Sequence, residues 1–218
     1  MRAVVTGGNR GIGLAIARKL ADKGIDLILV GKNRKTLESV KKELSEKVDV
    51  SVFACDVGND KEIKRLFKNK KIKGFDILVN NAGVAYYEPL SEMDERKIDE
   101  IIDVNLRGLI KFTKAAIPKM KKGIIINISS GAGKTGYSNF AVYCATKFGV
   151  IGFTESLAGE LDNIKVFAVC PGGTQTDMWE SLFPGEHASY RPEDVADTVM
   201  HVIENSKRIR PGAAIDVR

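Results

Sequence analysis

A tyrosine and a lysine four residues apart, Tyr143 and Lys147, with Ser130 thirteen residues before the tyrosine, are the residues of this chain best suited to acid–base chemistry. On a helix, a four-residue step returns two side chains to within about 40° of each other, so the phenol and the ammonium would face the same side. A free tyrosine has a pKa near about 10 and exchanges protons poorly at neutral pH unless a positive charge stabilises its phenolate. Lys147 is placed to supply that charge. Most pairs at this spacing are solvated surface pairs, so the surrounding motifs must support a catalytic role.

A glycine-rich turn follows the first apolar run and precedes an amphipathic helical pattern. It reads Thr-Gly-Gly-Asn-Arg-Gly-Ile-Gly over residues 6–13. Glycine lets the backbone approach a phosphate closely, and a helix N-terminus offers N–H groups without partners and the positive end of a dipole. The spacing differs from G-x-G-x-x-G, and glycine also serves in any tight turn from strand to helix. Its position after the first strand nevertheless favours binding of the phosphates of a dinucleotide.

The whole chain alternates short apolar runs with longer amphipathic ones, which is typical of βαβ units around a parallel sheet covered on both faces. We predict an α/β doubly wound Rossmann fold with seven parallel strands, at residues 2–6, 26–30, 51–55, 77–80, 123–128, 165–169 and 213–217. We expect helices at residues 12–23, 34–46, 60–69, 95–121, 140–161 and 192–205. The prolines and glycines clustered after the sixth strand indicate a mobile loop rather than regular structure. In such sheets ligands bind at the carboxyl ends of the strands, where the motifs fall.

Length and composition fit one domain. The 218 residues are 44% hydrophobic, enough for one sizeable core. We expect a cofactor-binding half over residues 1–123 and a catalytic and substrate-binding half over residues 124–218. The first strand begins directly after Met1, which leaves no room for a signal peptide, and no apolar run reaches membrane-spanning length. A cytoplasmic protein without a membrane partner is therefore expected.

The charged and metal-binding residue types do not suggest a nucleic-acid or metal site. Formal net charge is +6, but the densest basic stretch, Lys64 to Lys73, is interrupted by apolar residues at amphipathic spacing, so its lysines should form the wet face of a helix rather than bind nucleic acid. Three cysteines and two histidines lie far apart, without the paired spacing of a zinc site or a disulfide framework: Cys55, Cys144, Cys170, His187 and His201. We expect buried thiols and no metal.

Taken together, these motifs resemble those of the short-chain dehydrogenase/reductase family, in its compact single-domain branch, over nearly the whole chain. The T-G-x-x-x-G-x-G turn is residues 6–13, and N-N-A-G after the fourth strand is residues 80–83. Further matches, in chain order, are the D-V pair Asp56 and Val57, the helix asparagine Asn105, the serine Ser130, the Y-x-x-x-K pair Tyr143 and Lys147, the P-G turn at Pro171 and Gly172, and Thr176. Eight motifs in the family's order are far beyond chance.

The resemblance implies hydride transfer between a nicotinamide and a carbonyl or alcohol carbon. Tyr143 would be the general acid in reduction and the base in oxidation. Lys147 would lower the tyrosine pKa and hydrogen-bond the nicotinamide ribose, Ser130 would hold the substrate oxygen, and Asn105 would anchor a water joining Lys147 to solvent. Ser130 is preferred to its neighbour Ser129 because the family spacing places the serine thirteen residues before the tyrosine. The positions expected to contact the cofactor are Gly7, Asn9, Arg10, Gly11, Ile12, Gly13, Lys32, Asp56, Val57, Asn81, Ala82, Gly83, Tyr143, Lys147, Pro171, Gly172, Thr174 and Thr176.

Charge at the end of the second strand bears on the choice of cofactor. Enzymes of this kind that use NAD usually end that strand with an acidic residue, which binds the ribose 2′-hydroxyl and repels a 2′-phosphate. Here the position is Gly31, followed by Lys32, and Arg10 lies in the glycine turn. Two cations without a carboxylate suit a phosphate, which predicts NADP(H) as cofactor and reduction as the usual direction.

Substrate and partner are only outlined by the sequence. The expected walls are residues 84–90, 131–142 and 177–190, with the aromatic residues Tyr86, Tyr87, Tyr137, Phe140, Trp179 and Phe183. They suggest an apolar, flat small-molecule substrate, although each could equally pack under a loop. The final strand lacks the glycines that usually follow it in the family, which argues against tetramer packing. A homodimer through the helices at 95–121 and 140–161 is the favoured assembly.

Two alternatives remain beside a carbonyl reductase or alcohol dehydrogenase. A nucleotide-sugar epimerase or dehydratase of the family's extended branch also uses Tyr-x-x-x-Lys, but it needs a larger C-terminal substrate domain than the residues after Thr176 provide. A non-catalytic, NADP-sensing regulator would keep the fold, but such proteins typically lose the tyrosine or the lysine.

Overall fold

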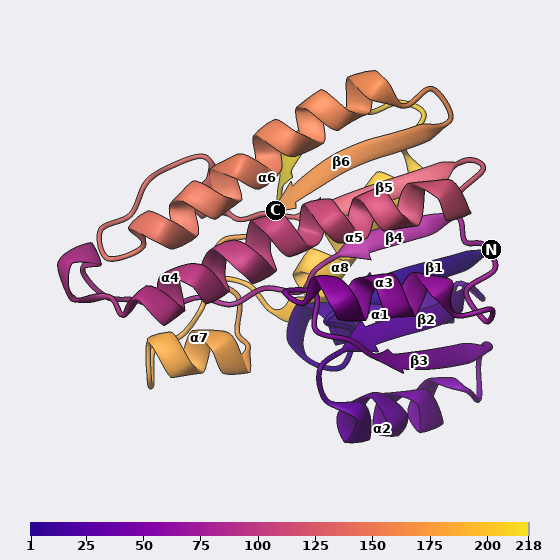
Figure 1. Ribbon diagram of the computed structural model, residues 1–218, viewed down its shortest axis with the longest axis horizontal. Helices are drawn as coiled ribbons and strands as arrows, with labels where there is room; N and C mark the ends of the chain where they lie inside the picture. The colour runs from indigo at the N-terminus through magenta and orange to yellow at the C-terminus, as the bar shows by residue number, and fades with distance from the viewer. Residues whose placement is uncertain (218) are drawn as a thin grey trace.

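The computed structural model describes residues 1–217. Seven parallel strands form one sheet in the order β3-β2-β1-β4-β5-β6-β7. Their bounds are β1 (Arg2–Thr6), β2 (Asp26–Gly31), β3 (Val50–Ala54), β4 (Ile77–Asn80), β5 (Gly123–Ile128), β6 (Ile164–Cys170) and β7 (Ala214–Asp216). The strand order reverses between β1 and β4, which confirms the predicted doubly wound Rossmann fold. Figure 1 shows the strand arrowheads directed toward one side of the molecule.

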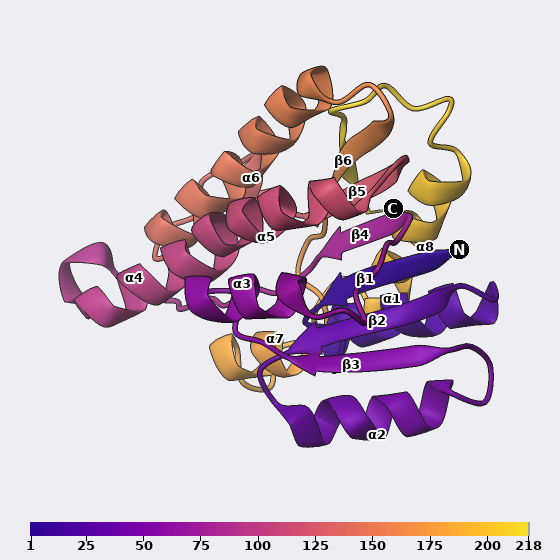
Figure 2. The ribbon, with the colours of Figure 1, turned by 45° about the vertical axis from the view of Figure 1, so that its right-hand side comes forward.

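Helices cover both faces of this sheet, as predicted (Figures 1 and 2). On one face, α1 (Gly11–Asp22), α2 (Arg34–Leu44) and α8 (Pro192–Glu204) enclose the first core cluster. On the other, α3 (Asp60–Lys68), α5 (Leu109–Ala116) and α6 (Ala141–Glu160) enclose the second. Successive residues of β1 point into different clusters, Val4 into the second and Val5 into the first. Because both faces are buried, β1 is an uninterrupted apolar run rather than an alternating one.

The helix predicted over residues 95–121 is divided. It consists of α4 (Glu95–Ile102), a π turn at Asp103–Gly108, α5 and a final 3-10 turn at Ile117–Lys119. The π turn brings the backbone against the loop after β3, because a Cβ at Gly108 would lie only 2.4 Å from the carbonyl oxygen of Val57. One extra residue in a turn hardly alters a helical hydrophobic pattern, so the sequence did not reveal it.

The segment after β6 contains a helix where a loop without regular structure was predicted. This helix, α7 (Asp177–Leu182), begins where the Thr176 hydroxyl accepts a hydrogen bond from the Trp179 N–H at 3.2 Å. Two backbone hydrogen bonds between Gly173, Gln175 and Tyr190 close the base of the segment. The prediction was therefore wrong for residues 177–182. There the Thr176 cap, together with a hydrogen bond from the Trp179 indole N–H to the Glu186 carbonyl oxygen at 2.8 Å, outweighs the nearby prolines and glycines.

The basic stretch is also divided. Helix α3 ends at Lys68, and the Asn69 side chain then accepts a hydrogen bond from the Lys71 N–H at 2.9 Å. Lys70, Lys71 and Lys73 consequently lie in the loop before β4, not on the predicted wet helix face. Asparagine stabilises turns in this way and interrupts the helix before the last lysines. The other predicted element bounds lie within two residues of the observed ones.

Candidate active site

The glycine turn between β1 and α1 leaves its backbone open to a ligand. Gly7 and Gly11 have φ angles of +65° and +51°, which favour glycine. A Cβ at Gly13 would lie 2.2 Å from the Gly7 carbonyl oxygen. Arg10 precedes α1, and its side chain does not cap the helix. Among the described residues, no side chain accepts a hydrogen bond from the first N–H groups of α1. A bare helix N-terminus behind a left-handed glycine turn fits a dinucleotide pyrophosphate.

Thr6 joins this turn to the N-N-A-G segment at the end of β4. Its hydroxyl oxygen accepts hydrogen bonds from the N–H groups of Asn81 at 2.9 Å and Ala82 at 3.1 Å. The Asn81 side chain returns a hydrogen bond to the Thr6 carbonyl oxygen at 3.0 Å. Thr6 was not among the predicted site residues, although its position as the last residue of β1 and the first of the glycine turn could have suggested this role.

The residues expected at the adenosine end meet beyond β2 and β3. The Asp56 carboxylate accepts a hydrogen bond from the Gly58 N–H at 2.9 Å and lies 3.3 Å from the ammonium of Lys32. Val57, the second residue of the predicted pair, is buried. The Asn9 side chain donates to the Thr36 hydroxyl at 2.9 Å, and its oxygen lies 2.7 Å from the place that a Cβ at Gly31 would occupy.

The turn after β6 lies against the glycine turn. The Pro171 carbonyl oxygen accepts a hydrogen bond from the Gly131 N–H at 2.8 Å. The Thr174 hydroxyl donates to the Gly172 carbonyl oxygen at 3.0 Å. A methyl carbon of Thr176 lies 3.2 Å from the place of a Cβ on Gly11. The predicted cofactor residues of both halves of the chain therefore border one region at the carboxyl ends of the strands.

Tyr143 and Lys147 both lie on α6, as predicted. The Lys147 ammonium is 5.5 Å from the centre of the Tyr143 ring and donates to the Ile128 carbonyl oxygen at 3.0 Å. It is almost fully buried, and this burial lowers the pKa of Lys147 from 10.5 to about 8. Gly83 lies beside it, since a Cβ there would be 3.9 Å from the ammonium.

The pKa of Tyr143 differs from the predicted direction. Its side chain is partly exposed, yet protein atoms surround the hydroxyl, and this burial raises the pKa of Tyr143 to about 12. The nearby Ser130 hydroxyl lowers the pKa of Tyr143, but this effect is smaller than that of burial. The expected lowering by Lys147 is absent in this state, because the ammonium points to the Ile128 carbonyl and desolvation of the phenolate dominates.

The two neighbouring serines face different ways. Ser129 is buried, and its hydroxyl donates to the Lys147 carbonyl oxygen at 2.9 Å, so it supports α6. Ser130 is partly exposed, accepts a hydrogen bond from the Ala132 N–H at 3.1 Å and lies within reach of the Tyr143 hydroxyl. Of the two, the structure brings only Ser130 to the tyrosine.

Asn105 lies in the π turn and is 1% exposed. Its side-chain oxygen accepts a hydrogen bond from the Val84 N–H, and its nitrogen donates to the Val84 carbonyl oxygen, both at 2.8 Å. Asn105 thus pairs with the backbone that follows the N-N-A-G segment and holds that loop against the helix.

Aromatic side chains from all three predicted walls meet beside Tyr143. Its ring centre is 5.4 Å from that of Phe140, which lies 5.0 Å from Tyr87. Phe183, directly after α7, lies 5.1 Å from Tyr87 and 4.6 Å from Trp179. Two of the predicted aromatic residues do not take part in this cluster: Tyr86 donates instead to Glu100 at 2.6 Å, and Tyr137 is 54% exposed.

Other kinds of site have little support in residues 1–217. All three cysteines are buried and unpaired, and burial raises the pKa of Cys55 to about 12. Over the same residues, no three histidine, cysteine, aspartate or glutamate side chains gather in a way that could hold a metal ion. None of the helices described is long and apolar enough to cross a membrane.

Comparisons with known proteins agree with this geometry. The family model for short chain dehydrogenases matches residues 1–187. The chain is 35% identical over 234 residues to the 3-oxoacyl-(acyl-carrier-protein) reductase FabG of Aquifex aeolicus, covering 99% of this chain and 94% of that protein. It is 33% identical over 214 residues to an uncharacterized oxidoreductase of Staphylococcus aureus strain USA300, covering 95% and 92%.

A solved structure extends the agreement to three dimensions. Levodione reductase superimposes with a TM-score of 0.90 over 99% of this chain and 95% of that one, at 23% identity, and so shares its fold. The motifs that resemble those of the family stand in the family's order, and the relatives match almost end to end. This chain is therefore an oxidoreductase of the short-chain dehydrogenase/reductase family, whose members use a nicotinamide cofactor.

Proposed function

We propose that this protein is an NADP(H)-dependent oxidoreductase that reduces a carbonyl group to an alcohol. The observation that carries the proposal is the meeting of Tyr143, Ser130 and Lys147 beside the open glycine turn. Bound NADPH would supply the hydride, and the protein would supply the proton and the positioning.

Tyr143 is proposed as the proton donor. With a pKa of about 12 the phenol is neutral at pH 7, which is the form that donates a proton to a developing alkoxide. Ser130, whose hydroxyl is near enough to lower the pKa of that phenol in part, would hold the substrate oxygen at the same point. Lys147, with a pKa of about 8, is mostly protonated at pH 7, so a positive charge stands near the phenolate that remains after transfer.

Asn105 and Lys147 would return the proton. In this proposal Asn105 anchors a water between Lys147 and solvent. Its side-chain oxygen already accepts one hydrogen bond from Val84 and has a second lone pair for such a water. The same oxygen lies 3.3 Å from the place of a Cβ on Gly83, next to the lysine.

Preference for NADP(H) is supported by the charges around Gly31. Arg10 pairs with Asp177 at 3.7 Å and Lys32 with Asp56 at 3.3 Å, and the two cations are 68% and 62% exposed. Such exposed pairs contribute only about 0–1 kcal/mol, so both cations can turn to a phosphate, which carries more charge than one carboxylate.

The aromatic cluster supports an apolar or aromatic carbonyl substrate, because it places ring faces and edges beside Tyr143. The FabG relative adds 3-oxoacyl thioesters as a second class worth testing.

NADPH oxidation with a panel of aldehydes, ketones, quinones and 3-oxoacyl thioesters tests the proposal. We expect saturable turnover with at least one class of flat or apolar carbonyl compound. Tight NADPH binding without turnover on the whole panel would favour the cofactor-sensing regulator. Conversion of a nucleotide sugar without net cofactor oxidation would favour the epimerase.

We also propose a homodimer through α4 and α6. Phe148 of α6 is 47% exposed and Ile102 of α4 is 40% exposed, and Ala145 and Gly152 continue an apolar, exposed strip on α6. Exposed large apolar residues on adjoining helices favour association. Sedimentation should show a dimer that Phe148→Glu converts to a monomer, and an unchanged dimer in that variant would exclude this surface.

A further inference from the structure

Strand β3 is an edge of the sheet (Figure 2). An edge strand has a neighbour on one side only, so half of its backbone groups face outward. The Cys55 N–H donates to the Gly31 carbonyl oxygen at 2.9 Å, and the Asp49 carbonyl oxygen accepts from the Leu27 N–H at 2.8 Å. Because backbone direction alternates along a strand, the odd-numbered residues face β2, and Val52 and Ala54 direct their N–H and C=O groups away from the sheet. These groups offer a template for one more strand.

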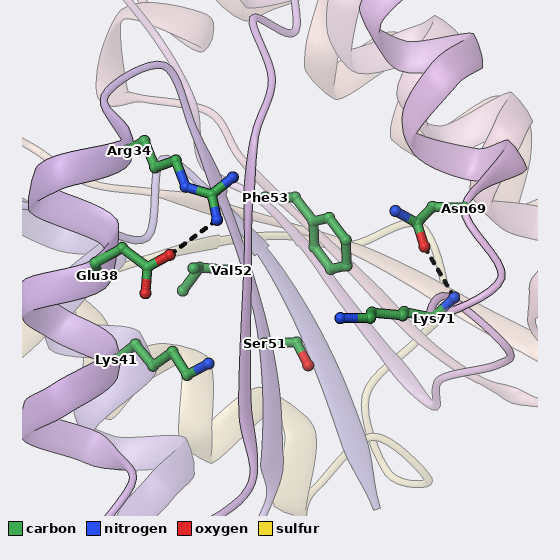
Figure 3. A pocket seen from close by; sticks show the side chains of 8 residues that line it. All are labelled: Arg34, Glu38, Lys41, Ser51, Val52, Phe53, Asn69 and Lys71. Atoms are coloured by element: carbon green, nitrogen blue, oxygen red, sulfur yellow. Dashed lines mark hydrogen bonds and ion pairs between the residues drawn. The ribbon is translucent and has the colours of Figure 1, made fainter.

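A groove of about 260 Å³ runs along this edge (Figure 3). Arg34, Glu38 and Lys41 of α2 border it on one side, and Asn69 and Lys71 border it on the other. Val52 packs toward the α2 face and Phe53 toward the α3 face, so each face of the strand adds an apolar contact. The groove therefore combines free backbone groups with side-chain contacts on both faces.

Positive charge flanks the groove on both faces. Arg34 and Lys41 lie on the α2 side, where Glu38 pairs with Arg34 at 3.1 Å. Lys71 lies on the α3 side, in the loop that also carries Lys70 and Lys73. Side chains of an extended strand alternate between two faces, so acidic side chains on either face of an added strand would meet a cation.

The charges also decide between possible occupants. A second copy of this edge would bring like charges together, which disfavours pairing between copies. A nucleic acid has no backbone that completes a β ladder, and of the groove residues only Phe53, itself half-buried, offers an aromatic ring. A peptide uses both the backbone edge and the cations.

We propose that the groove along β3 binds an extended acidic segment of a partner protein, which adds to the sheet as an eighth strand. The site is distant in sequence from the residues of the hydride-transfer centre and uses none of them. The proposal is therefore independent of the proposed enzyme activity.

Fluorescence anisotropy with a labelled ten-residue peptide of glutamate and threonine, with glutamates on both faces, tests this binding at low salt. We expect saturable binding that weakens as salt is raised. N-methylation of consecutive central residues keeps the charge but blocks the backbone ladder, and it should weaken binding about tenfold or more. Absence of saturable binding, or equal binding of the methylated peptide, would overturn the proposal.

Charge-reversal variants locate the peptide. Lys71→Glu and Lys41→Glu should each weaken binding about threefold or more, while Lys207→Glu, the same change in the loop before β7 at the opposite end of the sheet, should leave it unchanged. NADPH binding by all three variants should match that of the parent protein. Equal losses in all three variants, or tighter binding of single-stranded oligothymidine than of the peptide, would contradict a peptide site at β3.

Discussion

The proposed cofactor-binding region of this protein depends on its backbone, whereas the proposed reactive region depends on side chains. At the glycine turn the backbone would contact the cofactor, because Gly7 and Gly11 adopt left-handed conformations and Gly13 has no room for a side chain. At the reactive region the side chains of Tyr143, Lys147 and Ser130 would carry the chemistry. Burial of Lys147 and Tyr143 disfavours their charged forms.

This difference teaches where each region is vulnerable. A site made by the backbone tolerates most changes of its side chains but not replacement of its glycines, which adds a Cβ. A site made by side chains depends on one functional group and its surroundings. Changes in the first region should act on cofactor affinity, and changes in the second on turnover or on stability.

The largest effect is expected from Tyr143→Phe, which removes the proposed proton donor and keeps the ring. Turnover should fall by a factor of about 10²–10⁴, the range of general acid catalysis, while NADPH affinity stays nearly unchanged. Steady-state kinetics and a fluorescence titration with NADPH measure the two effects. Tyr137→Phe is the matched control, since Tyr137 is exposed and should be dispensable. Near-normal turnover of Tyr143→Phe would remove the tyrosine from its role.

Gly13→Ala should lower cofactor affinity, in contrast to Tyr143→Phe, which should lower turnover. Its Cβ would lie 2.2 Å from a backbone oxygen, so the turn must open. We expect NADPH affinity to fall about hundredfold, with about 1–3 kcal/mol lost from the free energy of unfolding. Calorimetric titration and denaturant unfolding measure both. In Gly159→Ala, a helical position with open space around it, affinity should stay normal and stability should rise slightly. Full NADPH affinity in Gly13→Ala would show that the turn adapts.

Lys147→Met tests the cost of the buried ammonium. Because the folded-state pKa of Lys147 is about 8 and the ordinary value is 10.5, burial of the charged form costs up to about 3 kcal/mol at pH 7. The parent protein recovers this energy as pH rises from 8 to 10.5, where the unfolded chain binds more protons than the folded one. The variant should therefore be the more stable protein at pH 7, and its advantage should shrink by pH 10. Urea unfolding at both pH values decides, and a pH-independent difference would contradict the lowered pKa.

Gly31→Asp sharpens the cofactor preference. The new carboxylate would repel a 2′-phosphate and accept hydrogen bonds from a ribose hydroxyl, so the preference for NADPH over NADH should fall about tenfold or more. The added Cβ meets the Asn9 side-chain oxygen at 2.7 Å, which a rotation of that side chain can relieve. Gly31→Ala carries the same Cβ without the charge and should keep the preference. Unchanged kinetics with both cofactors in Gly31→Asp would contradict NADP(H) as cofactor.

The smallest effect is expected where the two regions touch. Asp177 of α7 pairs with Arg10 of the glycine turn at 3.7 Å, and both side chains are largely exposed. In Asp177→Asn, Arg10 is released, and NADPH affinity should rise by at most about fivefold, the limit for an exposed ion pair, with NADH affinity unchanged. Equal changes for both cofactors would assign the effect to α7 rather than to Arg10.

Much of the site was predictable because its motifs are local. The glycine turn, the N-N-A-G segment and the tyrosine–lysine pair each lie within eight residues of sequence, next to the strand or helix that positions them. A parallel sheet brings the carboxyl ends of its strands together, so local motifs at those ends predict a common site. The roles of these residues in catalysis remain predictions for the experiments above.

What the sequence by itself determined is the doubly wound sheet, through its alternation of apolar and amphipathic runs, and the order of the motifs along it. Only the tertiary structure decided which of Ser129 and Ser130 faces Tyr143 and how Asn105 pairs with Val84. It also decided which lysines lie after the end of α3, in the loop beside the edge strand β3. It also set the pKa values of Tyr143 and Lys147. The physical reason is that desolvation and side-chain direction depend on contacts between segments distant in sequence, which no local pattern contains.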